Sequence, residues 1–99
     1  MERRVGRRVV AFQKYIKLQP DDPRGPFELG NSLFNKGKYP LAVDSYRNAI
    51  KLKSDMAMAH YNLSRALART GDTQAAEMEL HAARKIDPQV GLAQGDSSN

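Results

Sequence analysis

A 34-residue repeat constrains the fold of this chain more than any other feature. The stretch FELGNSLFNKGKYPLA, which begins at Phe27, returns in outline as YNLSRALARTGDTQAA, which begins 34 residues later at Tyr61. Apolar and small residues persist between the two copies while charged residues differ; the matching pairs include Leu29/Leu63, Leu33/Leu67, Gly37/Gly71, Ala42/Ala76 and Ala49/Ala83. A period of this length, in which only size and apolar character persist, indicates a solenoid of packed helix pairs.

The spacing of apolar residues predicts that every regular element is a helix. Apolar residues recur at intervals of three and four, as they do along one face of an α-helix. Gly37 and Gly71 suit the left-handed conformation that often ends a helix, and Asp72 or Thr73 can cap the helix that follows. The expected helices cover about residues 1–20, 23–36, 40–53, 56–69 and 74–86.

The net charge of +5 belongs to one segment. The first 20 residues carry six Lys or Arg and one Glu, and the remaining residues carry ten of each sign. An argument from charge to an anionic partner therefore concerns the first helix alone. No apolar run approaches the roughly 18 to 20 residues of a membrane-spanning helix, and we expect a cytoplasmic protein.

The sequence contains no recognisable catalytic or metal-binding pattern. It has no cysteine, which excludes disulfides, zinc thiolate sites and cysteine nucleophiles. His60 and His81 lack a further convergent ligand or nucleophile, and neither a glycine-rich phosphate loop nor the His-Glu-x-x-His spacing occurs. We therefore expect no enzymatic activity, no metal and no cofactor.

The repeat resembles the tetratricopeptide repeat family, whose unit has a large residue and Leu-Gly in its first helix, then a turn glycine, spaced alanines and a late proline. The first unit supplies Phe27, Leu29, Gly30, Leu33, Gly37, Tyr39, Ala42, Tyr46 and Ala49. The second unit supplies Tyr61, Leu63, Ser64, Leu67, Gly71, Ala76, Leu80, Ala83 and Pro88. Departures from the pattern include Ser54 in place of a late proline and Tyr15 where a small residue is expected.

The resemblance implies an all-α, right-handed α-solenoid of antiparallel helix pairs, with five helices and about two and a half repeats. Residues 1–22 would form the second half of a partial repeat, 23–56 and 57–90 two full repeats, and 91–99 a flexible polar tail. Repeats of this kind bury their faces against neighbours. We therefore expect an apolar edge near the C-terminus, at Ala76, Leu80 and Ala83, and either a longer array or self-association through the terminal helices.

The resemblance also implies protein–protein interaction, as a scaffold or adaptor, because the first helices of many members line a groove that holds a partner's peptide or helix. By register, the groove residues would be Phe27, Asn31, Asn35, Met58, Tyr61, Asn62, Arg65 and Arg69. Asparagine can donate and accept hydrogen bonds at once, and arginine matches carboxylates. Members that bind chaperone tails use basic residues and asparagines from three units. Only the two asparagines Asn31 and Asn62 match here, so binding of such a tail is not expected.

The basic first helix leaves alternatives open. Its apolar stripe is explained by packing on the second helix, which leaves four arginines facing solvent. These could contact an anionic surface, either nucleic acid or membrane: Arg3, Arg4, Arg7 and Arg8. Proteins that bind single-stranded nucleic acid favour aromatic residues among the basic ones, and no aromatic residue lies between these arginines. Nucleic acid and membrane are both less expected as partners than a protein. The helix could also be a targeting segment, and the repeats could be a structural segment of a longer array.

Overall fold

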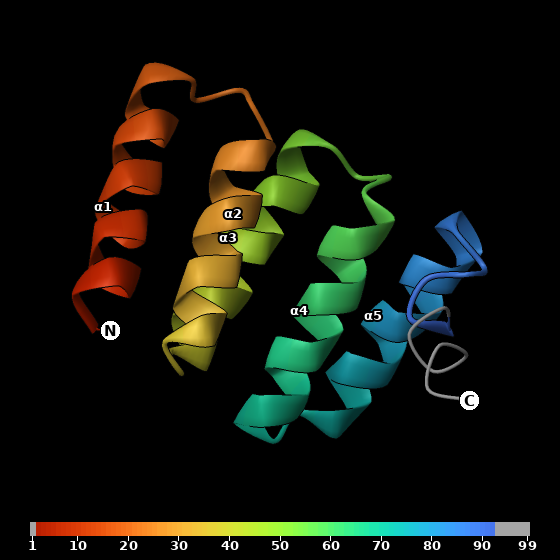
Figure 1. Ribbon diagram of the computed structural model, residues 1–99. Helices are drawn as coiled ribbons and strands as arrows, with labels where there is room; N and C mark the ends of the chain where they lie inside the picture. The colour runs from red at the N-terminus through yellow and green to blue at the C-terminus, as the bar shows by residue number, and fades with distance from the viewer. Residues whose placement is uncertain (1, 93–99) are drawn as a thin grey trace.

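Five α-helices pack one after another in the computed structural model, which describes residues 2–92 and, within the first helix, side chains from Gly6 onward. The helices are α1 (Glu2–Leu18), α2 (Arg24–Asn35), α3 (Tyr39–Leu52), α4 (Ala57–Thr70) and α5 (Thr73–Ile86). In Figure 1, α3 lies behind α2, and α5 lies beside α4. Each helix packs on its neighbours in sequence, and α2 also meets α4. The predicted all-α fold of five helices is confirmed.

Short glycine turns join the two helices of each pair. Gly37 and Gly71 have φ angles of 83° and 92°, a region that glycine enters without steric cost because it lacks a Cβ atom. Asp72 then caps α5, since its carboxylate accepts a hydrogen bond from the backbone nitrogen of Ala75 at 3.2 Å. Both turns and the cap agree with the positions that the sequence predicts.

The core is centred on Tyr46 of α3 and Leu63 of α4, which are each 1% exposed. Tyr46 lies against α2 at Gly30, where an added Cβ atom would stand only 2.6 Å from the ring. The small residue therefore permits the close approach of α2 and α3. The remaining buried members of the core are Leu33, Ala42, Val43, Ala66, Leu67 and Ala76.

The C-terminal end of the solenoid is covered, so the expectation of an apolar edge at Ala76, Leu80 and Ala83 was wrong. Ala76 and Ala83 are 6% and 0% exposed, and Leu80 is half-buried. The physical reason is that α5 packs this face against α4, where Ala76 joins Leu63, Ala66 and Leu67 in one core cluster. Val90, beyond α5, is also buried, at 5% exposed. The rest of the predicted tail, residues 93–99, lies outside the described residues.

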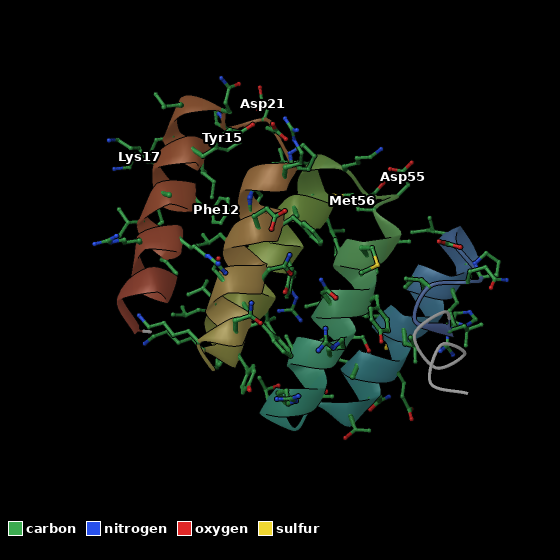
Figure 2. The ribbon with its side chains drawn as sticks, viewed as in Figure 1. Phe12, Tyr15, Lys17, Asp21, Asp55 and Met56 are labelled. Carbon is green, nitrogen blue, oxygen red and sulfur yellow. The ribbon has the colours of Figure 1, made fainter. Side chains whose placement is uncertain are left out.

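The junction between α1 and α2 accommodates the large Tyr15 opposite a glycine. A Cβ atom at Gly25 would stand 3.2 Å from the Tyr15 ring and 2.8 Å from Ile16. One repeat later the equivalent positions are Ala49 and Ala59, both 0% exposed. The first junction therefore pairs a large residue with a glycine where the next one pairs two alanines. Figure 2 shows Tyr15 directed from α1 towards the start of α2.

Asp22, in the loop between α1 and α2, forms hydrogen bonds with both helices of this junction. Its carboxylate accepts hydrogen bonds from the Tyr15 hydroxyl, from the Arg24 backbone nitrogen at 3.0 Å and from the Arg24 guanidinium at 2.8 Å. The bonds from the Arg24 side chain and then from Tyr15 hold the pKa of the Asp22 carboxyl well below its usual range, because they stabilise its charged form. The hydrogen bond to Asp22 also raises the pKa of the Tyr15 phenol.

Acid should therefore weaken the junction between α1 and α2. A carboxyl with a lower pKa in the folded chain stabilises the fold above its unfolded pKa of about 3.9, and this contribution is lost as the pH falls through the folded value. We expect the urea midpoint of the wild type to fall further between about pH 6 and about pH 2 than that of Asp22→Asn. Circular dichroism measures both midpoints. Asp21→Asn, at an exposed neighbour, should follow the wild type, and an equal pH dependence in all three proteins would contradict this role for Asp22.

The outer helices carry exposed apolar side chains. Val10 and Leu18 on α1 are 63% and 71% exposed, and Met78 on α5 is 66% exposed. Figure 2 shows Lys17 on the side of α1 that faces away from α2.

Within residues 2–92, none of the helices combines the length and the hydropathy that a membrane span requires.

Candidate functional site

An open cavity of about 590 Å³ lies between α1, α2 and α4, and we call it the groove. Most of its lining comes from α2 and α4, the first helices of the two repeats. The lining residues are Arg8, Phe12, Glu28, Asn31, Ser32, Phe34, Asn35, Tyr46, Met58, Asn62 and Arg65. Figure 2 shows the Phe12 side chain between α1 and α2, on this lining.

A chain of hydrogen bonds crosses the floor of the groove. The Tyr46 hydroxyl donates to Asn31 Oδ1 at 2.6 Å, and Asn62 Nδ2 donates to the same oxygen at 3.0 Å. Asn31 Nδ2 in turn donates to Glu28 Oε1 at 3.3 Å. Burial raises the pKa of the Tyr46 phenol, so its hydroxyl remains a hydrogen-bond donor. The network joins α2, α3 and α4 and fixes the orientation of both asparagines.

One polar atom of this network has no partner. Asn62 is 7% exposed, and among the described side chains its Oδ1 is the sole buried polar atom without a hydrogen bond. An unpaired buried acceptor costs about 1–3 kcal/mol, and folded proteins pair nearly all such groups. An unpaired acceptor beside an open cavity therefore marks a position where a ligand can complete the hydrogen bonding.

Arginines stack on aromatic rings at the end of the groove where α2 and α4 finish. The Arg65 and Arg69 guanidinium groups lie 4.8 and 5.3 Å from the centre of the Phe34 ring. Arg69 also lies 5.3 Å from the centre of the Tyr39 ring and donates to its hydroxyl at 2.8 Å. Such contacts contribute about 0.5–1 kcal/mol each at exposed sites, and here they orient both guanidinium planes.

The structure brings together five of the eight groove residues that the register predicts. These five line the same cavity: Asn31, Asn35, Met58, Asn62 and Arg65. Asn35 and Arg65 are exposed, Met58 is 44% exposed, and the other two belong to the buried network. They share one cavity because α2 and α4 turn equivalent faces towards the groove.

The other three predicted residues lie beside the groove and do not line it. Phe27 is half-buried and packs on Tyr46, with 6.1 Å between the ring centres. Tyr61 lies against Gly91, where a Cβ atom would stand 2.6 Å from the tyrosine ring. Arg69 is exposed and adjoins the groove through its stacking on Phe34.

Sequence reasoning missed the contribution of α1 to the groove. Arg8 was assigned to the solvent-facing arginines, and the structure places its exposed side chain on the groove wall. The missed signal is its register: the residue one repeat later is Ala42, which is fully buried. Arg7 is exposed, and the side chains of Arg3 and Arg4 lie outside the described residues.

The two histidines do not line the groove, and their surroundings differ. His60 Nδ1 lies 2.7 Å from the Glu79 carboxylate, and its Nε2 lies 2.9 Å from the Ser54 carbonyl. His60 therefore links α4 to α5 and to the turn before α4. His81 is exposed. In the described part of the chain, no three metal-ligating side chains gather at one place.

The family profile of the tetratricopeptide repeat matches residues 27–90, which contain both helix pairs that build the groove. The chain belongs to the tetratricopeptide repeat family. Tetratricopeptide repeat domains generally mediate protein–protein interaction and are typically non-catalytic. The match confirms the resemblance that the spacing of leucines, glycines and alanines indicated.

Known proteins share the sequence or the fold of this chain over part of their length. The chain is 25% identical, over 73% of its own length, to the tetratricopeptide repeat and J domain-containing co-chaperone DNJ1 of Cryptococcus neoformans var. grubii, of which it spans only 14%. It superposes on the Yersinia enterocolitica type III secretion translocator chaperone SycD with a TM-score of 0.85 and 22% identity, covering 98% of this chain and 70% of that one. MamA of MSR-1 superposes with a TM-score of 0.81 and 22% identity, over 87% of this chain and 49% of MamA. The two structural likenesses show the shared fold.

Proposed function

We propose that this chain binds a peptide segment of a partner protein in the groove, as a scaffold or adaptor without catalytic activity of its own. The observation that carries the proposal is Asn62 Oδ1, a buried acceptor without a partner beside an open cavity. A bound peptide would supply the missing donor and remove an unfavourable term of about 1–3 kcal/mol. The general role of the family in protein–protein interaction supports the same conclusion.

The two asparagines suit the polar groups of a peptide backbone. Asn31 Oδ1 already accepts from Tyr46 and from Asn62, so both of its lone pairs are used. One acceptor, Asn62 Oδ1, and one N–H of the Asn31 amide are left for a ligand. An acceptor and a donor side by side complement the N–H and C=O groups that every peptide presents. Asn62 Oδ1 is buried although the residue lines the groove, so contact with a peptide requires a rotation of its amide or one bridging water.

The other predicted groove residues would make weaker contacts with the peptide or hold the network in place. Met58 offers apolar contact area near the start of α4, and Asn35 offers a polar group near the end of α2. Phe27 holds the Tyr46 ring from the side, and Tyr61 and Arg69 extend the binding face beyond the groove. Truncating these residues should weaken peptide binding less than changing the amide of Asn62.

Three alternatives remain second to this one. Binding to an anionic surface would use the arginines of α1, of which Arg7 is exposed and Arg8 adjoins the groove. Self-association through the terminal helices would use exposed apolar residues such as Val10 and Met78. A purely structural role within a longer array would leave Asn62 Oδ1 unused. Each of these would be insensitive to a change of the Asn62 amide.

Replacing the Asn62 amide should weaken peptide binding about 10-fold without unfolding the chain. Leucine has a similar shape, and Asn31 Oδ1 keeps its hydrogen bond from Tyr46 when the Asn62 donor is lost, so no buried acceptor is left without a partner. We expect the wild type to enrich sequences from a phage-displayed library of random peptides, and Asn62→Leu to bind the enriched peptides about 10-fold more weakly. Fluorescence polarisation measures both affinities.

Asn48→Leu is the matched control, because Asn48 is an exposed asparagine on α3 outside the groove. It should bind the enriched peptides as the wild type does. If the wild type enriches no sequence, or if both leucine variants keep the affinity of the wild type, groove binding is wrong and the arginine surface of α1 becomes the leading site.

A further inference from the structure

The charges of the groove are separated along its length. Its basic lining residues are Arg8 of α1 and Arg65 of α4, and Arg65 lies over the ring of Phe34, the next-to-last residue of α2. Glu28 is the one carboxylate among the described side chains that line the groove, and it precedes Phe34 by six residues on α2. At 1.5 Å per residue, that spacing separates the two positions by about 9 Å.

Among the described side chains, no carboxylate forms an ion pair with the arginines at this end. The ion pairs within 4 Å among the described side chains are Arg24–Asp22, Lys53–Asp55 and His60–Glu79. Arg8, Arg65 and Arg69 therefore have no acidic partner within that distance. Two arginines four residues apart on one helix also repel each other. Arg69 lies near the C-terminus of α4, where the helix dipole stabilises a positive charge. Arg65 and Arg8 do not lie in the last turn of a helix, so the dipole does not explain their positions.

Stacking gives Arg65 and Arg69 a fixed orientation. Both guanidinium groups lie against the one Phe34 ring, at 4.8 and 5.3 Å from its centre, and Tyr39 holds Arg69 from the other side. A guanidinium that stacks by its face keeps N–H groups at its edge for hydrogen bonding. Its planar fork matches the two oxygens of a carboxylate or a phosphate. The arrangement holds two such forks in place before any ligand arrives.

We propose that Arg65 and Arg69, with Arg8 on the opposite wall, form a subsite for an oxyanion carried by a side chain of the bound peptide. The partner segment is therefore acidic where it passes the ends of α2 and α4. This inference rests on the proposed function, and it adds the chemistry of the partner and the direction in which its charge lies along the groove. Aspartate, glutamate and phosphorylated serine all carry the required oxyanion.

The test starts from peptides that the wild type enriches from the random phage-displayed library. We expect them to contain aspartate or glutamate at a fixed position, and we expect Arg65→Gln/Arg69→Gln to bind one of them about 10-fold or more weakly. Arg47→Gln/Arg84→Gln is the matched control, because it removes the same charge from exposed positions on α3 and α5. Its affinity should stay within about twofold of the wild type, since exposed charges away from the site are screened by salt.

Synthetic versions of one peptide distinguish the two sources of the oxyanion. Replacing its acidic residue by serine should weaken binding, and phosphoserine at that position should restore it. Phosphoserine binding more tightly than glutamate would identify the subsite as one for phosphate, and the reverse order would identify it as one for carboxylate.

Other outcomes would overturn the subsite. The subsite is wrong, and groove binding stands, if the enriched peptides have no acidic position and bind Arg65→Gln/Arg69→Gln as tightly as the wild type. An equal loss in both double variants would mean that overall charge, and not this subsite, attracts the peptide. If no peptide is enriched at all, groove binding and the subsite fail together.

Discussion

Leu63→Ala should lower the free energy of unfolding by about 2–5 kcal/mol, because it leaves a cavity at the centre of the core. Leu63 is 1% exposed and packs within the cluster that joins both repeats. Folded domains of this size are stable by only about 5–15 kcal/mol, so this one substitution removes a large share of the total. Urea denaturation measures the loss as a shift of the midpoint at an unchanged slope.

Leu41→Ala is the matched control for this prediction. Leu41 lies on α3 and is 51% exposed, so the same substitution there should change the free energy of unfolding by less than about 0.5 kcal/mol. A loss at Leu63 no larger than the loss at Leu41 would show that the core lies elsewhere.

Gly30→Ala should destabilise the chain even though alanine is the better helix former. Helix propensity favours alanine by about 1 kcal/mol, but its Cβ atom would stand 2.6 Å from the Tyr46 ring. That ring is 1% exposed and its hydroxyl donates to Asn31, so it cannot swing aside without breaking the groove network. Overpacking of a core costs about 1–3 kcal/mol, and we expect a net loss of about 1–2 kcal/mol in urea denaturation.

Two comparisons separate crowding at Gly30 from a general effect of replacing glycine. Gly6 lies inside α1 with no atom within 4 Å of an added Cβ, so Gly6→Ala should stabilise the chain by about 0.5–1 kcal/mol. In a Tyr46→Leu background, Gly30→Ala should cost less, because the second repeat carries Ser64 and Leu80 at the same two places. A gain in stability from Gly30→Ala in the wild type would refute the close contact.

The helices and turns could be predicted because their causes are local and occur twice. Gly37 and Gly71 end the first helices of both repeats, and each adopts the left-handed conformation that few other residues tolerate. Ala42 and Ala76 are small in both copies, and both are buried. A feature that recurs at the same register is readable from the sequence, since the same packing requirement acts on it each time.

Features that occur once were not predictable in this way. Val90 is one apolar residue beside a polar tail, so it gave no periodic signal, yet it is only 5% exposed. Arg8 resembles its neighbouring arginines in sequence, and only the placement of α1 against α2 brings it to the groove. The bond between Tyr46 and Asn31 depends on side-chain direction, which the spacing of residues does not determine.

The sequential packing of the helices makes opening of the groove a local event. Among the five helices, α1 packs against α2 alone, yet it supplies the wall that carries Arg8 and Phe12. Hydrogen exchange in folded proteins shows that such end elements detach at a fraction of the free energy of global unfolding. Detachment of α1 would remove one wall of the groove and leave the asparagines of α2 and α4 in their folded positions. Helix α1 can therefore move away from the groove while α2 and α4 stay in place.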